Sequence, residues 1–114
     1  MADGDDANQK RKFFRIEYPK SERPTFCCAG TNYAVLDVSE EGIRFELSPM
    51  HDLVAGERLV GSIDFCGRTN VKVKGTVLRI GNGFVVLSLE RHLPLPVIMS
   101  EQRYLLQNFH RQSS

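Results

Sequence analysis

The chain has 114 residues and a mass of 12.9 kDa, the size of one ordinary domain. Hydrophobic residues make up 41% and charged residues 25%, which are values typical of globular proteins, so a wholly disordered chain and a coiled coil are both disfavoured. The formal net charge of +1 argues against a general nucleic-acid binder, and no apolar stretch approaches the roughly 18 residues of a membrane span.

The charge is unevenly distributed along the chain. Residues 1–9 carry a net charge of −3 and little apolar content, which predicts a flexible tail without the pattern of a secretory signal. Residues 10–23 carry +4, and residues 24–114 are neutral in sum. Positive charge is therefore concentrated in one short segment near the N-terminus, and we expect the folded domain to span residues 10–111.

Six short β-rich runs follow this segment. The clearest one alternates Ile43, Phe45 and Leu47 with polar residues, as a strand with one buried face does. Glycine-containing turns separate the runs, including residues 30–32 and the tight reversal at 81–83. The predicted strands cover residues 25–30, 33–38, 43–47, 59–65, 71–78 and 84–89.

The spacing of these runs predicts a mainly β protein, a six-stranded antiparallel β-barrel. Closure into a barrel would also remove exposed strand edges. After residue 96 the apolar residues fall near helical spacing, which predicts a C-terminal α-helix. Its start is left open, because Ser100 is also a candidate cap for a shorter helix.

The basic segment contains Lys10, Arg11 and Arg15, with two phenylalanines between the arginines. A guanidinium offers a planar fork of donors for phosphate oxygens and also stacks on a base, so this pattern suits an anionic, aromatic ligand. The structural alternative is a solvated basic flank whose phenylalanines anchor the first strand.

A second polar cluster, residues 37–42, lies between two predicted strands and contains Asp37, Ser39 and Gly42. The carboxylate and hydroxyl can bond nearby backbone N–H groups, and Gly42 can take a positive φ in the turn. The cluster is therefore either an ordinary hairpin corner or a turn that presents acceptors to a ligand. A guanine edge, with its N–H donors, is a suitable ligand group.

The two clusters together resemble the signature of the PilZ domain, RxxxR followed by (D/N)xSxxG on a six-stranded antiparallel barrel. Arg11 and Arg15 match the first half, and Asp37, Ser39 and Gly42 match the second without substitution. The resemblance covers roughly residues 10–111 and implies binding of the bacterial second messenger cyclic di-GMP.

In such a domain the two arginines grip phosphate and guanine, and Asp37 and Ser39 contact the other side of the ligand. Lys10 stands where many relatives carry a further arginine, and this departure leaves open whether one ligand or an intercalated pair binds. Arg79 is a weaker candidate for another phosphate contact, the alternative being an exposed strand charge. Our hypothesis is that the ligand orders the N-terminal loop and alters binding to an unidentified downstream effector protein.

No other pattern indicates chemistry. The three histidines have no ligand-like spacing to one another or to the cysteines, so we expect no metal and no cofactor. The odd number of cysteines (Cys27, Cys28 and Cys66) forms no disulfide framework and favours reduced thiols in the cytoplasm. Without a nucleophile elbow or a plausible base, we expect no catalytic residues and no enzyme.

Two other functions are kept as alternatives. The first is a small barrel that binds single-stranded nucleic acid through basic and aromatic side chains of the N-terminal segment. The charge balance after residue 24 speaks against this function, so no nucleic-acid polymer is expected as a partner. The second is a ligand-free module that docks through its C-terminal helix, which predicts no dependence on Arg11 or Arg15. The oligomeric state, including a homodimer, is left open.

Overall fold

The computed structural model describes residues 15–47 and 52–109, with side chains to residue 108. Strands β2 to β7 lie close to the ranges expected from the sequence. The elements are β1 (Ile16–Glu17), a 3₁₀ turn η1 (Lys20–Glu22), β2 (Thr25–Cys28), β3 (Thr31–Val38), β4 (Gly42–Glu46), β5 (Arg58–Asp64), β6 (Asn70–Ile80), β7 (Phe84–Leu89) and α2 (Leu95–Phe109).

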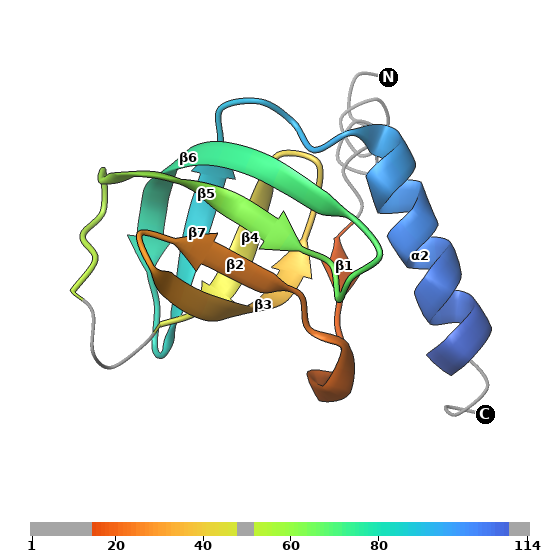
Figure 1. The fold of residues 1–114 in the computed structure, drawn as a ribbon. Coiled ribbons are helices and arrows are strands. Elements are labelled where there is room, and N and C mark those ends of the chain that lie inside the picture. The colour runs from red at the N-terminus through yellow and green to blue at the C-terminus, as the bar shows by residue number, and fades with distance from the viewer. Residues whose placement is uncertain (1–14, 48–51, 110–114) are drawn as a thin grey trace, which may run out of the picture.

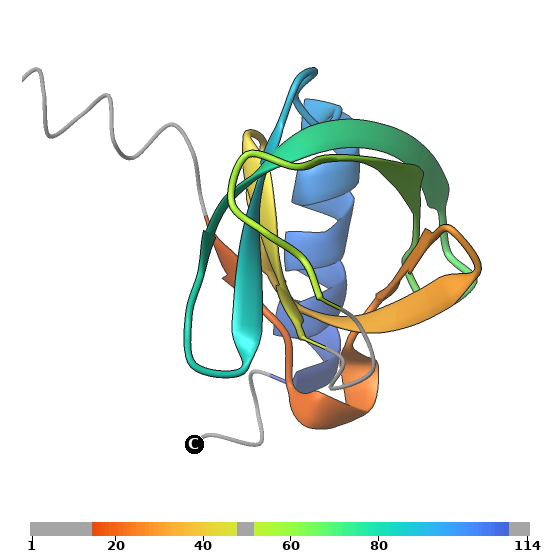
Figure 2. The same ribbon diagram turned by 90° about the vertical axis from the view of Figure 1, so that its left-hand side faces the viewer.

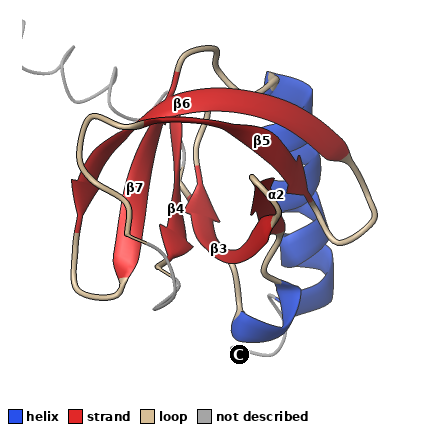
Figure 3. Cartoon of the chain, turned by 60° about the vertical axis from the view of Figure 1, so that its left-hand side comes forward, coloured by secondary structure: helices blue, strands red, loops and turns tan. Residues whose placement is uncertain are grey.

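Six of the strands form a closed antiparallel barrel in the order β3–β2–β5–β6–β7–β4, with β4 pairing back to β3 (Figures 1 and 3). The short strand β1 pairs with the C-terminal end of β3, where Ile16 pairs with Val38 and Glu17 with Asp37. The prediction of a six-stranded antiparallel barrel followed by one C-terminal helix is confirmed.

The core of the barrel is aromatic at its centre. Phe26, Tyr33 and Phe45 come from three neighbouring strands, and their ring centroids lie 4.8–6.1 Å apart. Viewed along the barrel in Figure 2, α2 lies behind the ring of strands. Leu93 and Ile98, at the start of this helical segment, are buried in the same core, so the helix closes one end of the barrel.

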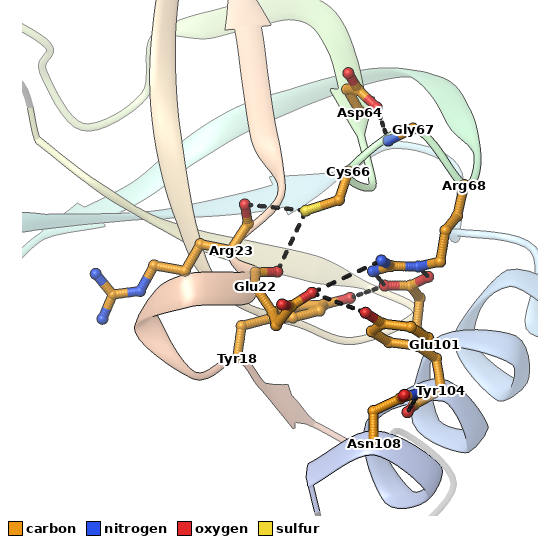
Figure 4. Close-up of polar contacts among 10 residues, drawn as sticks. All are labelled: Tyr18, Glu22, Arg23, Asp64, Cys66, Gly67, Arg68, Glu101, Tyr104 and Asn108. Atoms are coloured by element: carbon orange, nitrogen blue, oxygen red, sulfur yellow. Dashed lines mark hydrogen bonds and ion pairs between the residues drawn. The ribbon is translucent and has the colours of Figure 1, made fainter.

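A polar network holds α2 against the barrel (Figure 4). Glu101 is 2% exposed, and it accepts hydrogen bonds from Tyr18 at 2.8 Å and from two nitrogens of Arg68 at 2.9 and 2.8 Å. The Arg68 guanidinium also lies 3.9 Å from the ring centroid of Tyr104, whose hydroxyl donates to Glu22. Burial, and then the bond to Glu101, raise the pKa of Tyr18 far above that of an ordinary tyrosine.

The structure differs from the expectation in three places. β1 and η1 are not predicted, because two or three residues are too short to show a period. β6 continues to Ile80, and the helix begins at Leu95 rather than at a cap on Ser100. Pro96 is tolerated because the first helical N–H groups need no intrahelical partner. The expected tail over residues 1–9 lies outside the described residues.

Candidate functional site

A β-bulge turns Asp37 out of the barrel. Val35 and Val38 both face the core and are fully buried, so simple alternation cannot hold between them. The register with β4 shifts between Val35 and Asp37, which leaves Leu36 and Asp37 together opposite Arg44. A bulge re-aims a side chain in this way, and here it places Asp37 beside Arg44 on the outer face of the sheet.

A second bulge does the same on β6. The register with β7 shifts between Val77 and Arg79, so Leu78 and Arg79 together oppose Val86. Val86 in turn pairs with Arg44 of β4. The two bulges thus complete an outward-facing row that crosses four strands, Asp37, Arg44, Val86 and Arg79.

Asp37 is 5% exposed, and its carboxylate forms a charge-assisted contact. Arg44 donates from Nε to Oδ2 at 2.8 Å, and its Nη2 lies 2.6 Å from the same oxygen. No described residue donates to the other oxygen, Oδ1. The ion pair therefore fixes the carboxylate through Oδ2, and within the described residues Oδ1 keeps its capacity to accept a hydrogen bond.

The turn after Asp37 is closed by Ser39. Its backbone N–H donates to the carbonyl of Gly42 at 2.8 Å, and its hydroxyl lies 3.3 Å from the same oxygen. Gly42 does not use the positive φ that glycine allows, because it begins strand β4. Glycine is required there because a Cβ would lie 2.8 Å from the carbonyl oxygen of Leu87.

Arg15 reaches this turn through β1. Because Ile16 pairs with Val38, Arg15 stands at the next position along the ladder, beside Ser39. Its side chain is exposed and forms no ion pair with any residue that the structure describes. Arg11 and Lys10, the other basic candidates, lie outside the described residues.

The ring of Phe84 lies close to two arginines of the site. The guanidinium of Arg44 lies 5.0 Å from the Phe84 ring centroid, and that of Arg79 lies 5.5 Å from it, both within range of cation–π attraction. Gly81 makes room for the ring, since a Cβ there would meet Phe84 at 2.2 Å. Arg44 and Phe84 were not predicted from the sequence as site residues. The position of Arg44 between two inward-facing apolar residues places it on the outer face of the strand and was a usable signal.

Asp37, Arg44 and Arg79 line one cavity of about 360 Å³ over β4 and β7, which we call the β4–β7 cavity. Three arginines line it, against the carboxylates of Asp37 and Glu41. With Asp37 already paired, the lining favours an anion that also brings hydrogen-bond donors. The lining residues are Arg15, Asp37, Ser39, Glu41, Gly42, Ile43, Arg44, Leu78, Arg79, Val86 and Ser88.

Over 15–47 and 52–109, no three His, Cys, Asp or Glu side chains gather in a way that could hold a metal ion. In that part of the chain, no helix has the length and apolarity needed to cross a membrane.

Comparisons with known proteins agree with this architecture. The crystal structure of an uncharacterized Legionella protein has a TM-score of 0.61 to this chain at 13% identity, and the match covers 83% of this chain and 99% of that one. At this identity the likeness shows the fold alone. No curated protein matches significantly. The family model of the PilZ domain matches residues 9–105, and the chain therefore belongs to the PilZ domain family.

Proposed function

We propose that this protein is a receptor for cyclic di-GMP, which it binds in the β4–β7 cavity. PilZ domains typically bind this dinucleotide and are generally non-catalytic. The observation that carries the proposal is the meeting of Arg15 with Asp37 and Ser39 around one cavity, because these residues belong to two motifs more than twenty positions apart.

The charges of the cavity suit the phosphates. Cyclic di-GMP has two phosphodiester charges, and Arg15 and Arg79 form no ion pair with any described residue. Each charge-assisted hydrogen bond to a phosphate contributes on the order of 1.5–3 kcal/mol. A few such contacts and guanine stacking on a guanidinium reach the roughly −8 kcal/mol of micromolar binding. Arg11, by its place in the motif, is the second phosphate and base contact.

The acceptors of the cavity suit the guanine edge. Oδ1 of Asp37 accepts from the ring and exocyclic N–H groups of guanine, while Arg44 holds the carboxylate through Oδ2. The hydroxyl of Ser39 contributes a further acceptor, because its long bond to the Gly42 carbonyl leaves its lone pairs available. Adenine lacks the donor pair that this carboxylate accepts, so the site selects guanine.

The ligand acts through the segment that precedes β1. Binding of both arginines orders that segment over the cavity, at an entropic cost that lowers the net affinity. The ordered segment then offers a new surface to an effector protein. A second ligand stacked on the first is compatible with the same contacts.

The test is isothermal titration of the purified protein with cyclic di-GMP, with GTP and a short single-stranded RNA as matched controls. Saturable binding near micromolar or tighter, absent with GTP, supports the receptor, and the stoichiometry counts the ligands. Heat from the RNA alone would replace the proposal with a nucleic-acid barrel. If none of the three ligands gives binding heat, the remaining function is a ligand-free docking module.

A further inference from the structure

A second cavity lies on another face of the barrel. It measures about 630 Å³ and shares no lining residue with the β4–β7 cavity. Val60 and Gly61 of β5 form one wall, residues 71–74 of β6 the floor, and residues 90–94, which lead into α2, the other wall. We call it the β5–β6 cavity. None of the signature residues that the structure describes lines it.

The lining of the β5–β6 cavity is basic. Lys72 and Lys74 alternate with inward-facing valines on β6, so both ammonium groups project outward, and Arg91 is exposed on the opposite wall. None of the three forms an ion pair with a residue that the structure describes. The carboxylate of Glu90 is already held by Arg58, whose Nε donates to it at 3.0 Å. Among the residues that the structure describes, no ion pair compensates the charge of these three side chains.

Apolar surface accompanies this charge. Val60 is 60% exposed and stands directly across from Lys74 on the neighbouring strand. Pro94 lines the opposite wall, and Leu95, the next residue, is 49% exposed at the start of α2. An exposed apolar patch with a charged rim is typical of a protein–protein interaction site.

The wall of this cavity is bonded to the turn of the candidate ligand site. The N–H of Leu93 donates to the carbonyl of Glu40 at 2.7 Å, and the N–H of Leu89 donates to that of Glu41 at 2.9 Å. On the other side of the wall, the N–H of Glu90 donates to the backbone carbonyl of Lys74 at 2.9 Å. Backbone hydrogen bonds therefore join the turn between Asp37 and Gly42 directly to the cavity wall.

We propose that the β5–β6 cavity is the docking site for an acidic segment of a partner protein. Its carboxylates pair with Lys72, Lys74 and Arg91, and an apolar side chain of the segment packs against Val60 and Pro94. A peptide fits these features better than a nucleic acid does. The described lining residues include no Phe, Tyr or Trp, and His92 supplies the one aromatic ring among them, whereas a single strand needs several rings on which successive bases stack.

The docking site itself is independent of cyclic di-GMP, whereas its regulation through Leu93 and Glu40 rests on the proposed function. An occupied β4–β7 cavity changes the geometry of the turn, and the turn changes the wall against which the partner packs. Coupling free energies between such sites correspond to changes in affinity of about fivefold or more.

The experiment measures fluorescence anisotropy of a labelled short peptide in which Glu and Leu alternate, without cyclic di-GMP. Three proteins are compared: the wild type, the variant Lys72→Glu with Lys74→Glu, and a charge-matched control. The control, Lys20→Glu with Arg103→Glu, changes two exposed cations that line neither cavity. We expect the wild type and the control to bind alike, and the cavity variant to bind at least tenfold more weakly, while circular dichroism shows that all three are folded.

Several results would overturn the docking site. They are no binding of the peptide, equal affinities in the three proteins, or equal binding of a peptide in which Lys and Leu alternate. A short single-stranded RNA that binds in place of the peptide, and is lost in the cavity variant, would make this face a nucleic-acid surface. Cyclic di-GMP is added last. A peptide affinity that stays constant in a protein that binds cyclic di-GMP would remove the coupling and leave the docking site standing.

Discussion

Arg44 and Asp37 face each other across β3 and β4, and both nitrogens of the contact, Nε and Nη2, lie on the same carboxylate oxygen. The pair exists because the bulge in β3 turns Asp37 outward between two buried valines. A carboxylate held in this way has one defined orientation. The ion pair therefore links the stability of the turn to the shape of the candidate site.

A double-mutant cycle measures that link. For Asp37→Asn and Arg44→Leu we expect a coupling energy of about 1–3 kcal/mol in urea unfolding, because each single change leaves the other group partly buried without its partner. The exposed pair of Arg58 and Glu90 is the matched control and should give less than about 1 kcal/mol. Equal coupling in the two cycles would contradict a special role for the Asp37 pair.

Replacing Arg15 tests the phosphate contact. Arg15→Ala should weaken cyclic di-GMP binding at least tenfold, about 1.4 kcal/mol, because a charge-assisted contact is lost while the exposed position leaves the fold intact. Calorimetry measures the affinity, and Lys20→Ala, which removes an exposed cation outside the cavity, should change it little. An unchanged affinity for the Arg15 variant would remove this residue from the site.

Replacing Asp37 tests the choice of base. Asp37→Asn removes the negative charge and leaves one amide acceptor in place of the carboxylate, so its contact with the guanine edge weakens. We expect the preference for cyclic di-GMP over cyclic di-AMP to fall at least tenfold. Competition titration with the two dinucleotides reports this ratio directly. A variant that rejects cyclic di-AMP as strongly as the wild type does would show that another group reads the base.

Gly42→Ala tests the close approach between strands β4 and β7. A Cβ placed 2.8 Å from the Leu87 carbonyl oxygen forces the strands apart, and we expect a loss of about 1–3 kcal/mol in the free energy of unfolding. Ser88→Ala, at the exposed cross-strand partner of Gly42, is the control and should change stability by less than about 0.5 kcal/mol. Similar values for the two variants would argue against the steric reason for Gly42.

The pKa of Tyr18 predicts a loss of stability in alkali. Burial and the bond to Glu101 raise it above the ordinary value of 10.0, so the folded protein holds this proton more tightly than the unfolded chain does. Its contribution is complete below pH 10 and is lost above it, by about 1.4 kcal/mol per pH unit. Urea unfolding should show this fall, and Tyr18→Phe should reduce it. The same slope in both proteins would be evidence against the buried hydroxyl.

Much of the barrel could be predicted from local pattern. Ile43 and Phe45 alternate with outward residues, and Gly83, at φ +85°, makes the reversal expected before β7. The bulges could not be predicted, because a run such as Val35 to Val38 looks like a continuous strand until its partner is known. The bulges bring Asp37, Arg44 and Arg79 into one row across the sheet. This row depends on the register between strands that are far apart in the sequence.

The signature residues show a similar division. The spacing of Asp37 and Ser39 predicted a turn, and the turn is present. Glycine is needed at position 42 because β7 approaches it closely. Its cross-strand partner Ser88 is 46 positions further along the chain, and no local propensity reveals such an approach. The contacts of Phe84 were missed for the same reason, since cation–π neighbours follow from the row across the sheet.

The barrel consists of two runs of neighbouring strands, β2 to β4 and β5 to β7, which meet along the β2–β5 and β4–β7 pairings. The β4–β7 cavity lies over the second of these seams, so it exists only after the two halves have joined. Closing contacts of long sequence separation is the entropically costly part of folding. A ligand of this cavity binds the finished barrel alone and, at a hundred times its Kd, stabilises it by about 2.7 kcal/mol. Under the proposed function, the concentration of cyclic di-GMP would then set the lifetime of the protein against proteolysis as well as its occupancy.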